Sequence, residues 1–319
     1  MLGPSGAESP RAPASLCRFE EHMMNLTLYL ATVLIWGSTW IAIAWQLGPV
    51  PIEVSVLYRF ALAALALFAL LTVSGKFPRL PRQGQGYAAL LGALLFSTNF
   101  LCFYHATQYI PSGLSAVVFA CASIFNGLNL WLFEGQKPSR QWLHGSLMGL
   151  VGTLLLFWPS LASSELGAQA WKGLALACAG TLCFSLGNLV SARGQRRGFT
   201  VLQMVPWGMV YGVVLLLGWV LLLGQELVWP QDGRYWGALL YLALFGSVIA
   251  FTAYLTLVGR IGASKAAYAT VLFPLVALGL STLFEGFVWQ PVSMVGMAVC
   301  LLGNLVIFGL PRRLGPQAA

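Results

Sequence analysis

Charge is what this sequence has least of. Of its 319 residues, only 8% are Asp, Glu, Lys or Arg and 58% are hydrophobic, whereas soluble domains usually carry about 25% charged residues. A protein surrounded by water needs more charged side chains than this chain can supply. The composition therefore excludes a soluble globular protein and predicts an integral membrane protein.

The sequence also lacks the motifs of a metal, cofactor or catalytic site. Its six cysteines form no CxxC pair and no metal-ligand spacing, so we interpret them as small apolar packing residues. No Gly-rich phosphate loop and no nucleophile elbow occurs in a fitting context. We therefore expect no metal centre, no cofactor and no enzyme activity.

Long apolar runs, in contrast, are abundant. A helix that crosses the hydrocarbon core of a bilayer needs roughly 20 residues. Ten such runs predict an all-α membrane protein with ten transmembrane helices, at residues 26–47, 54–74, 86–108, 113–133, 141–159, 171–192, 201–223, 236–257, 264–284 and 291–310. The connections between them are too short to hold a soluble catalytic head.

The basic residues indicate how the chain lies in its membrane. A net charge of +8 could indicate a nucleic-acid partner, but Lys and Arg also collect in cytoplasmic loops. With the N-terminus inside, fourteen of the 17 basic residues fall in cytoplasmic segments, Lys172 and Arg234 fall outside, and Arg59 lies within the second run. We therefore predict a membrane protein with both termini cytoplasmic and no nucleic-acid partner.

The two ends of the chain are polar. Residues 1–25 are rich in Ala, Pro and Ser and lack the basic start and short apolar core of a secretory signal. We expect a disordered tail there, and a short cytoplasmic tail at residues 311–319.

The four-residue sequence LFEG occurs twice, at residues 132–135 and 283–286. Residues 100–157 align with 251–308 without a gap and share twelve identities, including glycines ten and seventeen positions after the glycine of each LFEG. A unit of five spans crosses the membrane an odd number of times, so its second copy enters from the opposite side. The sequence therefore predicts two inverted five-helix repeats, at 26–160 and 171–310, as in many secondary transporters.

Several segments together resemble a known family. They are "LIWGSTWIAIAW" in the first run, "YRFALAALAL" in the second, "GASKAAYATVLFPLVALGLSTLFEG" in the ninth, and the GxxxxxxG that follows each LFEG. This pattern resembles the EamA family of the drug/metabolite transporter superfamily over residues 26 to 310. The resemblance implies an inner-membrane exporter of amino acids and other metabolites, with helices one to four and six to nine around the pathway. One departure is Pro274, whose counterpart is Ser123.

Arg59 is the basic residue within the second run, about 8 Å along the helix from Glu53 at 1.5 Å per residue. A charge at mid-span costs roughly 2.5 to 3.5 kcal/mol on insertion scales, so it normally has an internal partner or lines water. Arg59 could bind a substrate carboxylate, pair with Glu53 or a helix carbonyl, or extend to the outer surface. The sequence leaves these three interpretations open.

Other polar and aromatic residues within the runs are candidate substrate contacts. Lys265 shares a helix face with Tyr268 and is either a cytoplasmic anchor or a cation at the cytoplasmic gate. Asn99, Asn126 and Asn188 are either substrate contacts or contacts between helices. Trp36 and Trp40 form either an aromatic wall or part of the interfacial belt, and their place near the middle of the first run favours the wall. Phe119 is a further candidate substrate contact.

Proton coupling has only weak candidates, because no Asp or Glu lies deep in any run. The candidates are His105 and three carboxylates at run ends, Glu53, Glu134 and Glu285. In the inverted repeat, Glu134 lies at the cytoplasmic surface and Glu285 at the outer one. For both, we favour a simple helix stop before the turn that Gly135 or Gly286 begins.

These observations favour a secondary transporter that moves a small organic solute, most simply an amino acid or related metabolite, by alternating access. Export of cationic drugs is the alternative within this class, and a non-transporting membrane protein on a transporter scaffold is the competing class. Gly145 and Gly149 suit close helix contact in the fifth helix, and a homo-oligomer could form through the fifth or tenth helix.

Overall fold

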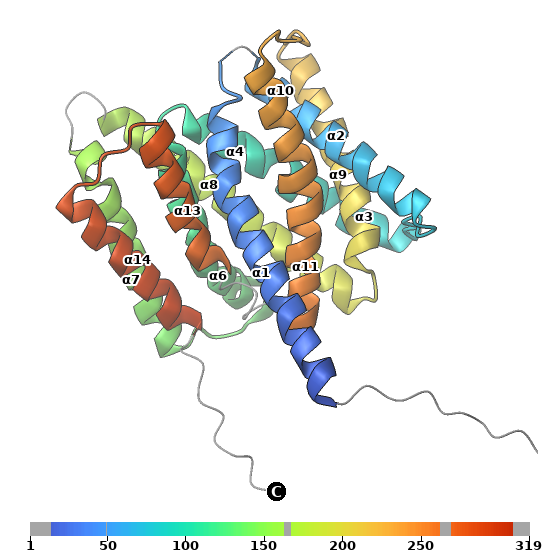
Figure 1. Ribbon diagram of the computed structural model, residues 1–319, viewed down its shortest axis with the longest axis horizontal. Coiled ribbons are helices and arrows are strands. Elements are labelled where there is room, and N and C mark those ends of the chain that lie inside the picture. The colour runs from blue at the N-terminus through green and yellow to red at the C-terminus, as the bar shows by residue number, and fades with distance from the viewer. Residues whose placement is uncertain (1–13, 49, 163–166, 262–268, 309–319) are drawn as a thin grey trace, which may run out of the picture.

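The computed structural model describes residues 14–48, 50–162, 167–261 and 269–308, and within these ranges it contains helices and no strands (Figure 1). The helices are α1 (Ala14–Ala44), α2 (Ile52–Val73), α3 (Arg82–Ala93), η1 (Leu94–Thr98), α4 (Asn99–Thr107), α5 (Ser112–Ala120), α6 (Ala122–Glu134), α7 (Arg140–Leu161), α8 (Gly167–Arg196), α9 (Val201–Leu222), α10 (Gly233–Leu240), η2 (Tyr241–Ile249), α11 (Ala250–Ile261), α13 (Ala269–Phe284) and α14 (Pro291–Phe308).

The described helices include 8 that are long and apolar enough to cross a membrane. Two of these spans are composite, because α3, η1 and α4 run on as Arg82–Thr107, and α5 and α6 as Ser112–Glu134. Shorter apolar helices, Leu272–Phe284 and Pro291–Ile307, lie where the ninth and tenth spans were predicted. The expected start of the ninth span, at 264–268, lies outside the described residues. The protein is a multi-pass membrane protein.

The first helix starts earlier than the sequence predicted. Residues 14–25, which we expected in a disordered tail, are the first turns of α1, whereas residues 1–13 lie outside the described residues. Extending an existing helix adds one hydrogen bond for each residue that is fixed, while starting a new helix is costly. The apolar segment that follows therefore supports a helical conformation in the polar residues before it.

The helices run back and forth between two ends of the bundle (Figure 1). We call the end where α1 begins and α14 ends the lower face, and the end where α1 ends and α14 begins the upper face. By this alternation α5 begins and α13 ends at the upper face, whereas α6 and α8 end at the lower face. At the centre, α1 packs against α13, α11 and α5.

Helices α7 and α14 form a pair at one side of the bundle (Figure 1). Glycines bring their backbones together: a Cβ on Gly145 would lie 2.5 Å from the carbonyl oxygen of Gly303, and one on Gly296 would lie 2.5 Å from the backbone nitrogen of Leu156. The close contact predicted for Gly145 is therefore made within the chain. A homo-oligomer through these helices stays a prediction, and it would use outward apolar residues such as Leu147 and Trp158.

This packing predicts a loss of stability when Gly296 is replaced by Ala. The added methyl group would meet the α7 backbone, and overpacking of this kind typically costs about 1 to 3 kcal/mol. The matched control is Gly218→Ala in α9, where an added Cβ has nothing within 4 Å. Thermal unfolding of both variants in one detergent should show a lower Tm for Gly296→Ala alone. Equal Tm values would contradict the contact.

Two π-helical segments interrupt corresponding spans. In η1 the Ser97 hydroxyl donates to the carbonyl oxygen of Gly92 at 2.9 Å, and in η2 the Ser247 hydroxyl donates to that of Leu242 at 2.9 Å. Each serine hydroxyl therefore bonds to the backbone carbonyl oxygen five residues earlier in the chain. Both segments lie in the third span of their sequence repeat, shortly before the aligned Phe100 and Phe251. Such segments often occur at functional sites.

The ends of the two LFEG helices confirm the interpretation as helix stops. Gly135, the C-cap of α6, has a left-handed φ of +67°, and Gly286, just past α13, has a φ of +69°. Glycine adopts this conformation without steric cost, which is why it so often ends helices. Within the fourth span the helix also breaks at Cys121, whereas α13 continues through Pro274.

Candidate functional site

A small cavity lies at the centre of the bundle. Its volume is about 40 Å³, counted as space open to the centre of a water molecule, so it is small. Its lining comes from α1, α2, α4, α5, α8, α11 and α13: Trp36, Thr39, Trp40, Ile43, Arg59, Asn99, Phe100, Phe103, Phe119, Phe184, Phe251 and Phe273. None of these residues comes from α7 or α14, which are the predicted outer helices.

Arg59 is the charged group of this cavity. Its side chain is buried, with 2% of the residue exposed. Nε donates to the Ser247 hydroxyl at 3.1 Å, Nη1 makes a long 3.5 Å contact to the Tyr104 hydroxyl, and Cζ lies 4.3 Å from the centre of the Phe100 ring. Within the described part of the chain, no carboxylate forms an ion pair with it.

Two of the three interpretations of Arg59 conflict with this geometry. Extension to the outer surface requires an exposed guanidinium, but the group is buried. Pairing with Glu53 conflicts with the partners of that carboxylate, which are His105 Nε2 at 3.1 Å and Gln225 Nε2 at 2.7 Å. Pairing with a helix carbonyl conflicts with the hydrogen bonds of Arg59 among the described residues, which go to two hydroxyls. The remaining interpretation, binding of a substrate carboxylate, stays a prediction.

The residues that hold Arg59 were not among the sequence candidates. Ser247 reaches Arg59 from the π segment η2, and Tyr104 comes from α4. The Tyr104 hydroxyl donates to Gln46 Oε1 at 2.6 Å, and Gln46 Nε2 has no partner among the described residues. The available signal was the presence of hydroxyl and amide side chains within apolar runs, but single-sequence periodicity does not reveal which of these face one another.

The aromatic candidates lie on the cavity. Trp36 Nε1 donates to the carbonyl oxygen of Gly246 at 3.2 Å, and the Trp36 ring packs edge-on against Phe251 with centroids 5.2 Å apart. Trp40 packs against Phe119, with a centroid distance of 5.8 Å. Trp36, Trp40 and Phe119 therefore form part of an aromatic wall of this cavity.

The three asparagine candidates lie in different surroundings. Asn99 lines the cavity and donates from Nδ2 to the carbonyl oxygen of Gly180 at 2.8 Å. Asn126 instead accepts from the Ser185 hydroxyl at 2.7 Å, and Ser185 accepts from Asn129 at 2.8 Å, so this chain connects α6 to α8. Asn188, in α8, is half-buried and is not among the lining residues.

Lys265 and Tyr268, the two remaining candidate substrate contacts, lie outside the described residues.

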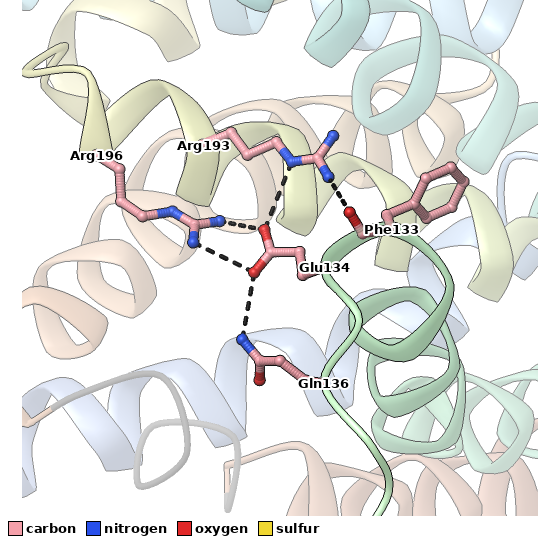
Figure 2. Close-up of polar contacts among 5 residues, drawn as sticks. All are labelled: Phe133, Glu134, Gln136, Arg193 and Arg196. Atoms are coloured by element: carbon pink, nitrogen blue, oxygen red, sulfur yellow. Dashed lines mark hydrogen bonds and ion pairs between the residues drawn. The ribbon is translucent and has the colours of Figure 1, made fainter.

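The four proton-coupling candidates occupy the two ends of the bundle. Glu53 and His105 are brought together at the upper face, at the start of α2 and the end of α4. Glu285, also at the upper face, accepts three hydrogen bonds from Ser112 and Ser281. Glu134, at the lower face, pairs with Arg193 and Arg196, as Figure 2 shows.

A larger pocket of about 430 Å³ lies at the upper face. Its charged lining residues are Asp232, Arg234 and Glu285, and the Arg234 guanidinium lies 4.7 Å from the centre of the Trp45 ring. Trp45 and Phe284 also line this pocket, and their rings pack edge-on with centroids 5.5 Å apart.

The fold and this site define a multi-pass helical membrane protein with a buried cationic group in an aromatic cavity. The chain belongs to the EamA-like transporter family, whose sequence model matches residues 23–158 and again residues 171–309. It is thus a transporter-family protein of the drug/metabolite superfamily.

Several similar proteins match over most of their length. An "Uncharacterized inner membrane transporter YedA" of Escherichia coli (strain K12) is 27% identical over 91% of this chain and 92% of its own. A "Probable amino-acid metabolite efflux pump" of Salmonella typhimurium is 24% identical over 90% and 95%. A solved structure titled "Crystal structure of protein" has a TM-score of 0.65 at 18% identity, covering 88% of this chain and 95% of that one, and it shows the fold alone.

Proposed function

We propose that this protein is an inner-membrane secondary transporter that exports amino acids or related small carboxylates by alternating access. The observation that carries the proposal is Arg59, a buried guanidinium at a central cavity without an acidic partner in the described part of the chain. A buried charge without a partner costs free energy, and its presence is explained if a substrate supplies the missing anion.

The geometry of Arg59 suits a carboxylate. Guanidinium and carboxylate form parallel, charge-assisted hydrogen bonds. Among the described residues, the hydrogen-bond partners of Arg59 are two neutral hydroxyls, which contact Nε and Nη1. Asn99, on the same cavity, has an amide oxygen that can accept a hydrogen bond from the ammonium group of an amino acid. The cationic centre also disfavours lipophilic cations, so cationic drug export is the weaker proposal.

We propose the inverted ten-helix architecture for the pathway. Three observations support it: the family matches twice, LFEG recurs, and the π segments η1 and η2 occupy corresponding spans. The repeats at 26–160 and 171–310 would be the moving halves, with the central cavity between them. From the distribution of Lys and Arg, we take the lower face as cytoplasmic and the upper face as external.

The relatives support the location and the solute class. One is named an inner membrane transporter and another a probable amino-acid metabolite efflux pump. The proposal makes the protein a carrier rather than an enzyme, as members of a transporter family are.

The experiment that tests the proposal is solute flux through purified protein in liposomes. The panel should contain neutral and acidic amino acids, nucleosides and cationic dyes, with and without a pH gradient. Flux of one or more amino acids that protein-free liposomes do not show is the expected result. Flux of cationic dyes alone would overturn the assigned solute class, and no flux of any compound would overturn transport.

We propose the Glu53–His105 pair as the proton-binding site of the cycle. Its atoms lie 3.1 Å apart at the upper face, and imidazole is the side chain that titrates near neutral pH. If transport is stimulated by a pH gradient, Glu53→Gln should abolish the stimulation while leaving flux without a gradient largely intact. Glu226→Gln, an exposed carboxylate beside Gln225, is the control. Stimulation that persists in Glu53→Gln would contradict this site.

A further inference from the structure

The Glu285 carboxylate connects the two sequence repeats at the upper face. It accepts hydrogen bonds from the backbone nitrogen of Ser112 at 3.1 Å, from the Ser112 hydroxyl at 2.6 Å and from the Ser281 hydroxyl at 2.5 Å. Ser112 begins α5, and the preceding Pro111 makes no side-chain cap to this helix. The first N–H groups of a helix lack partners within it. A carboxylate from the second repeat therefore caps a helix of the first.

An aromatic contact lies beside these hydrogen bonds at the upper face. Trp45, just after α1, and Phe284, the last residue of α13, pack edge-on with centroids 5.5 Å apart. Together with Glu285 they line the pocket of the upper face. The end of α1, the start of α5 and the end of α13 thus meet at this pocket.

Two buried polar atoms near these helix ends have no hydrogen-bond partner among the described residues. Gln46 and Ser115 are buried, with 1% and 0% of their surface exposed, and neither Gln46 Nε2 nor the Ser115 hydroxyl has a partner among the described residues. Gln46 follows Trp45, and Ser115 lies one turn into α5 from Ser112. A buried polar group without a hydrogen bond is costly. Separation of these helix ends would let water or a solute reach both groups.

The other LFEG glutamate makes the corresponding connection at the lower face (Figure 2). Glu134, at the end of α6, accepts from Arg196 with both oxygens and from Arg193 Nε at 3.5 Å. Arg193 also donates from Nη2 to the carbonyl oxygen of Phe133 at 3.0 Å. Both arginines lie in α8, which belongs to the second repeat. At this face too, a glutamate joins the two repeats.

We propose that the two LFEG glutamates are the gate latches of the transport cycle. Glu285 holds the upper exit closed and Glu134 holds the lower entrance closed, and each set of bonds breaks when its own face opens. With both sets formed, hydrogen bonds join helices of the two repeats at the upper face and at the lower face. The inference rests on the proposed function, because only a solute carrier needs two gates that open in turn.

The test measures how accessible each gate is, without any solute. Ser115→Cys reports on the upper gate, and Ser191→Cys, a buried position one turn before Gln195 in α8, reports on the lower gate. Full-length protein in lipid nanodiscs is labelled with a bulky hydrophilic maleimide, and mass spectrometry of peptides gives the rate at each cysteine. The native cysteines are quantified separately, so they do not obscure the reporters.

Breaking one latch should open one gate. Glu285→Gln is expected to speed labelling at position 115 by about tenfold, the effect of losing one bond to a charged group, and to leave position 191 unchanged or slower. Arg196→Gln is expected to speed labelling at position 191 by about tenfold and to leave position 115 unchanged or slower. Ser112→Ala removes one of the three bonds and should have a smaller effect in the same direction as Glu285→Gln, without removing a charge.

Controls with the same charge change are present in the chain. Glu226→Gln lies at the upper face and Arg197→Gln follows Arg196, and both residues are exposed. Neither control should change a labelling rate. Equal acceleration at both reporters in a latch variant would indicate general loosening and overturn the proposal, as would no acceleration at either.

The two proposals fail separately. If the latch variants change accessibility as expected but the liposomes show no flux, the latch proposal is supported. In that case either the proposed solute class or the proposed transport function is wrong. If amino acids are transported and the latch variants change no labelling rate, the latch proposal alone fails.

Discussion

Replacing Arg59 by Gln is expected to lower amino-acid flux by at least about 30-fold, because loss of one partner of a buried charge pair costs roughly 2 to 5 kcal/mol. The same change should leave the folded protein as stable as the wild type, or more stable. Arg59 has no acidic partner in the described residues, so its removal relieves a desolvation cost rather than breaking an ion pair. Flux and thermal unfolding of the purified variant check both results.

Arg59→Lys is the matched variant, since it keeps the charge but loses the planar fork that binds a carboxylate with two bonds. We expect intermediate flux. A large fall in Tm for Arg59→Gln together with unchanged flux in the surviving protein would instead assign Arg59 a structural role.

Replacing Phe119 by Ala is expected to have the largest effect on stability. Its ring lies at the centre of the aromatic wall, with centroids 4.4 Å from Phe184, 5.5 Å from Phe103 and 5.6 Å from Phe273. Deletion of a buried Phe ring costs about 3 to 5 kcal/mol in soluble proteins. We expect about 3 kcal/mol here, because lipid is as apolar as the protein interior and lost packing contributes most of the effect.

The control for Phe119 is Phe77→Ala, at a position where 51% of the residue is exposed. Phe119→Leu keeps most of the volume and should retain most of the stability. Chemical denaturation in mixed micelles measures all three variants. Equal loss in Phe77→Ala and Phe119→Ala would contradict the packed aromatic wall.

Much of the architecture was predictable because bilayer physics constrains sequence strongly. The length of apolar runs predicted the spans, and the left-handed glycines after LFEG were predicted as helix stops. Residues 14–25 were misjudged because a polar composition does not reveal that a neighbouring helix can extend through it. The contact between Gly145 and Gly303 needs the relative placement of two distant helices, which periodicity does not provide.

Five of the nine candidate substrate contacts lie on one cavity, and their role in binding stays a prediction. Arg59, Trp36, Trp40, Asn99 and Phe119 all line the central cavity, because charge, amide and aromatic groups within apolar runs usually need a protein or cavity environment. The partners of Arg59 were not predicted, since Ser247 reaches it from a π segment that no spacing rule indicated. The role of LFEG in joining the two repeats also became visible only in three dimensions.

The measurement that tests the central claim most directly compares an amino acid with its methyl ester, in wild-type protein and in Arg59→Gln. Competition for flux in liposomes gives the relative affinity of each compound. If Arg59 binds the substrate carboxylate, wild-type protein should prefer the free acid over the ester by about tenfold or more, as expected for one charge-assisted pair, and Arg59→Gln should lose this preference. An equal preference for the acid in both proteins would contradict the account.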